Sequence, residues 1–179
     1  NYLIASMQQF ERTTFENIRT LDQWNELSNR MAVRAQDLAA STARAGSVIH
    51  NAGDSMEFLN GVTAALVQAT KRSGQEIGNA IRTFGTYTYR LRSVTQLESL
   101  GIQIRNKQTG SLRSFGDVMT QTAIKWDTFS DTQQRAIAQA IAGTRRQNEF
   151  LTLMREFPEV LNAAVIASES FGSAEKEAV

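Results

Sequence analysis

The sequence is poor in residues on which many enzymes and small stabilised domains depend. Among its 179 residues there is no cysteine, one proline and one histidine. Without cysteine, the chain can form no disulfide, no thiolate nucleophile and no cysteine-based metal site. His50 lies beside a predicted turn and no Ser-His-Asp set can be assembled around it, so we interpret it as a surface or capping residue. A single proline suits long helices, because proline breaks helix interiors.

Long apolar runs and enzyme motifs are also missing. The longest apolar run covers residues 163–167, whereas a helix that spans a bilayer needs about twenty residues. No GxGxxG, P-loop, HExxH or EF-hand pattern occurs. We therefore predict that the chain is not an enzyme and has no catalytic residue, no cofactor and no metal ligand. Contact with a membrane would require a segment outside this chain.

The two ends of the sequence suggest a fragment. The first residue is Asn1 rather than methionine, and no basic segment followed by an apolar one comes after it. Residues 173–179 are typical of the opening of a helix that is cut short. We therefore expect the chain to be a piece of a longer protein.

Charge is unevenly distributed along the chain, although the net charge is only +1. Residues 1–70 hold five basic and seven acidic residues, residues 71–146 hold twelve and five, and residues 147–179 hold two and six. A basic middle between acidic ends permits contacts between copies of the chain. It also permits a weak attraction to nucleic acid, or it is simply a solvated face. These alternatives stay open, and no specific nucleic-acid partner is predicted.

Apolar residues recur at spacings of three and four, or their multiples, through the first fifty residues. They are Leu3, Met7, Phe10, Leu21, Trp24, Met31, Ala35, Leu38, Ala45 and Ile49. Other positions of this seam carry polar residues: Thr14, Asn17, Ser28 and Thr42. These polar residues argue against a strong coiled coil. We predict one long or once-broken helix to about residue 30 and another from about residue 36 to residue 50, with an apolar seam that favours self-association.

Caps and glycines divide the rest of the chain into further helices. Four pairs match the capping-box spacing: Asp54 with Glu57, Ser73 with Glu76, Thr95 with Glu98, and Ser130 with Gln133. Gly143 is a candidate helix end, and Pro158 suits the first residue of a last helix. Gly78 and Gly85 lie seven residues apart on one predicted face, which either permits close helix packing or marks a weak helix.

Residues 102–115 are the only candidate for β-structure. Ile102 and Ile104 alternate, residues 106–110 are turn-like, and Leu112 and Phe115 can pair with the isoleucines. An isolated hairpin is marginal in water, so this one must pack on helices or on another copy. The predicted fold class is therefore mainly α, an elongated or bundled multi-helix segment with one small β-hairpin near residues 102–115. Its expected parts are a long N-terminal helical segment (1–50), a helical region with the hairpin (51–157), and a C-terminal helix with the start of a truncated downstream helix (158–179).

Basic and aromatic side chains supply the candidate interaction residues, which are Arg90, Arg92, Trp126, Arg145, Arg146 and Phe150. Tyr87 and Tyr89 lie close in sequence to Arg90 and Arg92. Such a mixture of aromatic and basic residues occurs on surfaces that bind single-stranded nucleic acid, and equally at the amphipathic end of a helix. The second pair of arginines can clamp a phosphate or a carboxylate, or pair with Glu149 or Asp131. We expect Trp126 and Phe150 to share one core.

Several ordered pieces of the sequence carry a family resemblance. Residues 126–134 (WDTFSDTQQ), followed by residues 140–145 (AIAGTR), resemble the KW…LSDTQQ…AGTRQ…F…LM pattern in the core region of phage tail tape-measure proteins. Residues 100–102 with 114–118 are similar to that family's ELGI…FR…GDVL, and residues 74–84 resemble its SG…GNALKTIF. Residues 173–177 resemble its GSAE run. The resemblance covers roughly residues 24–179.

The resemblance implies a structural role. Proteins of that family act as a ruler and scaffold around which the tail tube polymerises, and they leave the tube ahead of the DNA. It implies a small homo-oligomer, preferably a trimer, with tail-tube protein, tail assembly chaperones and tail-tip proteins as partners. The implied location is the lumen of the tail tube in the virion, and the host cytoplasm during assembly. Two alternatives are a helical membrane-active or channel segment for genome delivery, and a cell-wall hydrolase domain, which such long proteins can carry elsewhere.

Overall fold

The computed structural model describes residue 10 and residues 14–170, and this part of the chain is mainly α-helical, as predicted. Its helices are α2 (Thr14–Arg30), α3 (Ala35–Asn51), α4 (Met56–Thr70), α5 (Gly74–Tyr87), α6 (Leu91–Ser99), α7 (Phe115–Lys125), α8 (Asp131–Ala142), α9 (Gln147–Arg155) and α10 (Phe157–Ser168), with a 3-10 turn, η1 (Trp126–Thr128). The predictions for Leu3, Met7 and residues 173–179 lie outside the described residues.

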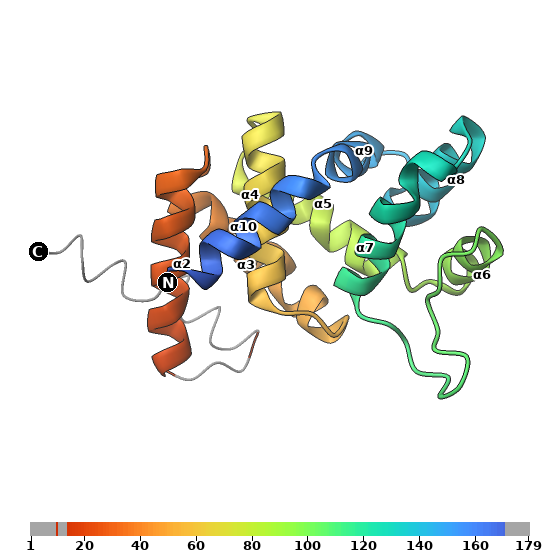
Figure 1. Ribbon diagram of the computed structural model, residues 1–179, viewed down its shortest axis with the longest axis horizontal. Helices are drawn as coiled ribbons and strands as arrows, with labels where there is room; N and C mark the ends of the chain where they lie inside the picture. The colour runs from red at the N-terminus through yellow and green to blue at the C-terminus, as the bar shows by residue number, and fades with distance from the viewer. Residues whose placement is uncertain (1–9, 11–13, 171–179) are drawn as a thin grey trace, which may run out of the picture.

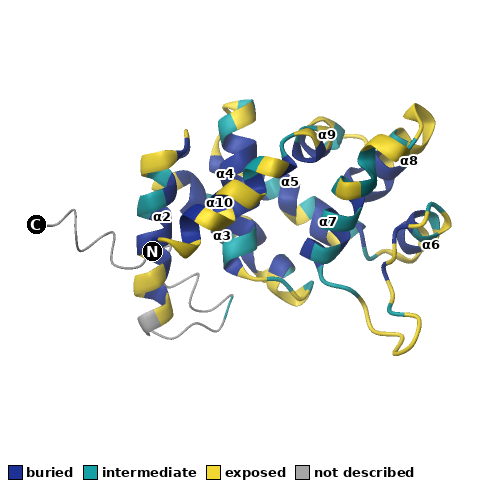
Figure 2. Cartoon of the chain, in the orientation of Figure 1, coloured by how far each residue is buried: buried dark blue, intermediate teal, exposed yellow. Residues whose placement is uncertain are grey.

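The helices form an elongated bundle. Figure 1 shows α2 at one end of the long axis and α6 and α8 at the other, with α3, α4 and α5 between them. Helix α10 returns across α4 and contacts α2, so the last described helix closes the bundle at the end where the first one lies. A single core cluster runs through the helices, and the burial colours in Figure 2 follow it along the bundle.

Most of the described apolar seam turns inward, whereas Leu21 and Ala35 are exposed. The chain bends at residues 31–34, close to the predicted break, so α2 and α3 are separate helices. Trp24, Leu38 and Ile49 are all buried within the chain, and Trp24 donates its indole N–H to the Asn60 side chain at 3.2 Å. A proposal of self-association therefore has to rest mainly on other surfaces.

Glycines allow α5 to approach α3 very closely. A Cβ atom at Gly78 would lie 2.8 Å from the Cα of Ser41 and 2.9 Å from the Cβ of Arg44. At Gly85, a Cβ atom would lie 2.8 Å from a methyl carbon of Val48. These separations are shorter than van der Waals contact, so no larger residue fits without movement. Of the two readings of the glycine spacing, close helix packing is confirmed.

This packing makes a testable prediction for Gly78→Ala. Alanine is the better helix former, but its methyl group would collide with backbone rather than with a flexible side chain. We expect the free energy of unfolding to fall by about 1–3 kcal/mol, the usual cost of overpacking. Urea denaturation measures it, with the exposed Gln75→Ala on the same helix as control. A variant as stable as the parent would mean that α3 and α5 can separate at no cost.

Two of the predicted capping boxes are confirmed. The Ser73 hydroxyl accepts the Glu76 backbone N–H at 3.2 Å, and the Glu76 carboxylate accepts the Ser73 N–H at 3.3 Å. Ser130 and Gln133 make the same reciprocal pair at the start of α8. Gly143 ends α8 with a φ of 62°, as predicted. Pro158 lies in the first turn of α10, but as its second residue rather than its first, because the helix begins at Phe157.

The other two predicted caps are wrong, because tertiary contacts take the residues elsewhere. Helix α4 is capped by Ser55, whose hydroxyl accepts the Phe58 N–H, while Asp54 accepts the backbone N–H of Gly116 at the start of α7. Helix α6 begins at Leu91, so Thr95 and Glu98 lie within it. Capping spacing alone therefore placed two helix starts incorrectly.

The predicted β-hairpin is reduced to a single antiparallel bridge between Arg105 and Leu112, and the described residues contain no β-strand. Around this bridge, the Arg113 N–H donates to the Ile104 carbonyl at 2.8 Å. Ile102 and Ile104 are both fully buried in the helical core, whereas Leu112 is 59% exposed. The isoleucines are thus used to anchor a loop on helices, as the marginal stability of a free hairpin requires.

Candidate functional site

Trp126 and Phe150 meet in an aromatic cluster between η1, α9 and α5. Their ring centroids lie 5.7 Å apart at an interplanar angle of 78°. Phe150 also packs edge-to-face on Phe84 at 5.8 Å. Phe84 and Phe150 are fully buried, while Trp126 is only partly buried. The two predicted residues are therefore brought together, with Phe150 inside the core and Trp126 at its outer edge.

Arg90 and Arg92 lie at the far end of the bundle, beside the junction of α5 and α6. The Arg90 guanidinium stacks over the Tyr87 ring, 3.4 Å from its centroid. The Tyr87 ring in turn lies against Gly143, where an added Cβ would be only 2.8 Å from a ring carbon. Both arginines line a pocket of about 190 Å³ between α6 and α8, and both are exposed. This face is cationic and partly preorganised by stacking.

Tyr89, the second tyrosine of this stretch, is committed to the fold. Its hydroxyl donates to the backbone carbonyl of Arg113 at 2.8 Å. Burial raises the pKa of Tyr89 above its ordinary value, and the nearby carboxylates of Asp54 and Asp117 raise it further. The phenol therefore stays protonated and holds the loop after the bridge against the end of α5.

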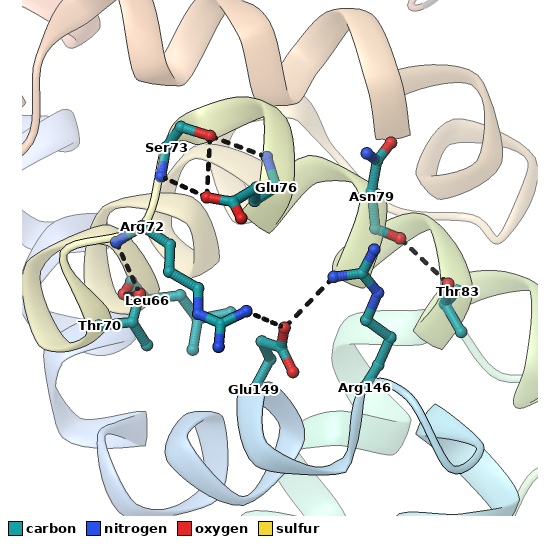
Figure 3. A network of polar contacts seen from close by, with 9 residues as sticks. All are labelled: Leu66, Thr70, Arg72, Ser73, Glu76, Asn79, Thr83, Arg146 and Glu149. Atoms are coloured by element: carbon teal, nitrogen blue, oxygen red, sulfur yellow. Dashed lines mark hydrogen bonds and ion pairs between the residues drawn. The ribbon is translucent and has the colours of Figure 1, made fainter.

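Arg145 and Arg146 follow Gly143 and line a neighbouring pocket of about 420 Å³ with Tyr87. Their side chains have different uses. Arg146 donates to a Glu149 carboxylate oxygen at 3.3 Å, and Arg72 donates to the same oxygen at 3.1 Å (Figure 3). Arg145 is exposed to solvent. One arginine of the pair is thus structural, and the other belongs to the cationic face.

The shared carboxylate of Glu149 joins two parts of the chain, the end of α4 through Arg72 and the start of α9 through Arg146. Only 3% of the Glu149 side chain is exposed, whereas the Arg72 and Arg146 side chains are 46% and 29% exposed. A buried carboxylate is tolerated only when it is paired and hydrogen-bonded, which these two guanidinium groups provide. The pairing of Arg146 with Glu149 was one of the alternatives that the sequence left open. The part played by Arg72 was missed, because 77 positions separate it from Glu149.

The described residues show neither a metal centre nor a membrane span. No group of three or more His, Cys, Asp or Glu side chains in them could hold a metal ion. None of the helices in this described part is long and apolar enough to cross a bilayer. The described residues do contain a cationic face, an aromatic cluster and exposed apolar side chains.

Comparison with known families places the chain more closely. The model of the phage-related minor tail protein family matches residues 1–143, about four-fifths of the sequence. The chain therefore belongs to the phage-related minor tail protein family, and as a structural component of a phage tail it is a protein of the virion. The match includes the first residues, on which the sequence resemblance does not rely, and ends before Arg145, Arg146 and Phe150. No solved structure matches the chain.

Proposed function

We propose that this chain is part of a tape-measure protein, the scaffold that sets the length of the tail tube and is released during DNA ejection. The observation that carries the proposal is the ordered series of sequence pieces from residues 74–84 to residues 140–145, each in the family's order and spacing. Membership of the minor tail protein family supports it. The role is structural rather than enzymatic, and it is carried out in the lumen of the tail tube.

A ruler function predicts that tail length follows chain length. Duplicating residues 14–170 in the gene of the parent protein should give longer tails. The added length would reach roughly 240 Å if these residues lie as straight helix at about 1.5 Å per residue, and less if they stay folded. Electron microscopy of the particles measures this length directly. Infectious particles with unchanged tail length would refute a ruler role for this segment.

Its proposed partners follow from the same role. We infer contacts with the tail-tube protein, tail assembly chaperones and tail-tip proteins, and self-association into a small oligomer, preferably a trimer. The cationic face, defined by Arg90, Arg92 and Arg145, suits an acidic protein surface. Stacking of Arg90 on Tyr87 and the internal hydrogen bond of Tyr89 leave these rings less available for stacking on bases, which favours protein over single-stranded nucleic acid.

This choice predicts weak DNA binding despite the eight basic and two acidic residues within residues 71–113. A surface that followed a phosphate backbone would lose about 0.7–0.9 log units of affinity per log unit of salt for each phosphate neutralised. We expect dissociation constants above the micromolar range at physiological salt, measured by fluorescence anisotropy in a salt series. Arg90→Glu with Arg92→Glu should change this binding little, as should the control Arg19→Glu with Arg44→Glu at exposed positions elsewhere. Sub-micromolar affinity lost only in the first double variant would reassign this face to nucleic acid.

A further inference from the structure

Beyond its first turn, the outer face of helix α10 has no charged residue and carries exposed apolar side chains, which is unusual for a helix at a protein surface. Between Glu159 and Glu169 its sequence carries no charged residue. On the side away from the core, Leu161 is 57% exposed and Val165 is 55% exposed, one helical turn apart. Surface helices normally present a charged stripe to water, and a helix that is apolar all round is usually buried. Figure 2 shows exposed residues along this side of α10. This face is therefore suited to being covered in the assembled protein.

An apolar recess lies directly beside this ridge. It has a volume of about 660 Å³ and is bounded by α7, η1, α9 and the start of α10. Its apolar lining residues are Ala123, Ile124, Trp126, Leu151, Met154, Phe157, Pro158 and Leu161. Ile124 is 78% exposed and Leu151 is 37% exposed at its edges. Exposed apolar side chains from three helices thus converge on one place, as they do at protein interfaces.

Charges of both signs surround the recess. Asp127 and Arg155 line it, Arg155 also pairs with Glu156 at 3.1 Å, and the ridge itself is neutral. A phosphate backbone would meet an acid at this rim, so nucleic acid is a poor fit. A surface that carries both signs is complementary to itself, because the basic group of one copy can face the acidic group of another.

From this geometry we propose that the recess receives the Leu161–Val165 ridge of a second copy of the chain. Ridge and recess lie side by side on one face, so each copy presents both halves of the contact. Two copies can exchange ridges about a two-fold axis, or each copy of a ring can insert its ridge into the next. This inference rests on the proposed self-association, and it locates the surface through which the copies associate. It buries Leu161, Val165 and Ile124, and it covers the outer edge of Trp126.

The first test compares oligomer dissociation in variants of the ridge. Sedimentation equilibrium of the parent over a concentration series should show an oligomer, and Leu161→Glu with Val165→Glu should raise its dissociation constant at least about tenfold. Both side chains are exposed, so the variant should keep the helical circular dichroism of the parent. Leu91→Glu is the matched control, because Leu91 is 79% exposed on α6 at the other end of the bundle.

The second test asks whether the partner surface also carries Asp127 and Arg155, as it must if the partner is a second copy of the chain. Arg155→Asp alone and Asp127→Arg alone should each weaken association, since each replaces the opposite charges that face each other across the contact by like charges. The two changes together restore opposite signs, and they should restore association only when both sides of the contact are this surface. Trp126 fluorescence should shift to shorter wavelength on association and lose this shift in the ridge variant.

The outcomes separate this contact from the wider proposal. An oligomer unaffected by the ridge and rim variants would overturn the contact and leave self-association standing on another surface. A chain that stays monomeric at all concentrations would overturn the contact and the proposed oligomer, while the tail-length experiment would still decide the ruler role. Binding of phosphatidylcholine vesicles by a monomer, lost in the ridge variant, would assign the face to lipid and overturn the contact between copies.

Discussion

Phe150→Ala should lower the free energy of unfolding by about 3–5 kcal/mol, the usual cost of removing a buried phenylalanine. The side chain is fully buried and touches both Phe84 and Trp126 edge-to-face, so its loss removes two aromatic contacts and leaves a cavity. Guanidinium denaturation followed by circular dichroism measures the change. Trp126→Ala should cost less, because Trp126 is only partly buried.

The neighbouring Leu151 provides a control for this prediction. It lies on the same helix but is 37% exposed, so Leu151→Ala should change stability much less than Phe150→Ala. A loss below about 1 kcal/mol for Phe150→Ala would mean that the aromatic cluster collapses around the gap, since the cost depends on how well a site can relax.

Replacing both Arg72 and Arg146 by methionine should destabilise the fold by about 3–5 kcal/mol, because Glu149 would remain buried without a cation. Methionine keeps much of the length of the arginine stem, so the loss reports mainly on the charge. A third change, Glu149→Leu, removes the stranded carboxylate and should recover a large part of the lost stability. Urea denaturation of the three proteins measures both steps.

A matched pair of arginines separates this effect from general loss of charge. Arg92 and Arg145 are exposed on the same end of the bundle, and their joint replacement by methionine should leave stability nearly unchanged. If the triple variant were no more stable than the double variant, the loss would come from arginine packing rather than from the unpaired carboxylate.

The sequence predicted those parts of the fold that depend on neighbouring residues. The capping boxes at Ser73 and Ser130 need only a partner three positions away, and the pairing of Arg146 with Glu149 has the same spacing. The break between α2 and α3 was also close to its predicted place. Local chemistry suffices for such features, because all the groups involved lie within one helical turn.

Features that depend on distant residues were missed or placed wrongly. Asp54 has the spacing of a cap but is drawn to Gly116, which is 62 positions away. The alternation of Ile102 and Ile104 imitates a strand, yet both side chains enter the helical core. The recess beside Trp126 is assembled from separate helices, and no single stretch of sequence contains its pattern. Its only local signal was the absence of charge along α10.

The return of α10 to the first helices has a consequence for the timing of folding. Gly61 on α4 packs closely against Val160, and Arg30 at the end of α2 pairs with Glu169 at 2.9 Å, across 139 positions. Helices α2 and α4 therefore cannot complete their packing until α10 has left the ribosome. At about 5–20 residues per second, the roughly hundred residues between α4 and the end of α10 take on the order of 5–20 s to synthesise. During this interval the nascent chain presents an uncovered apolar surface, and this is when a cellular chaperone would have most to bind.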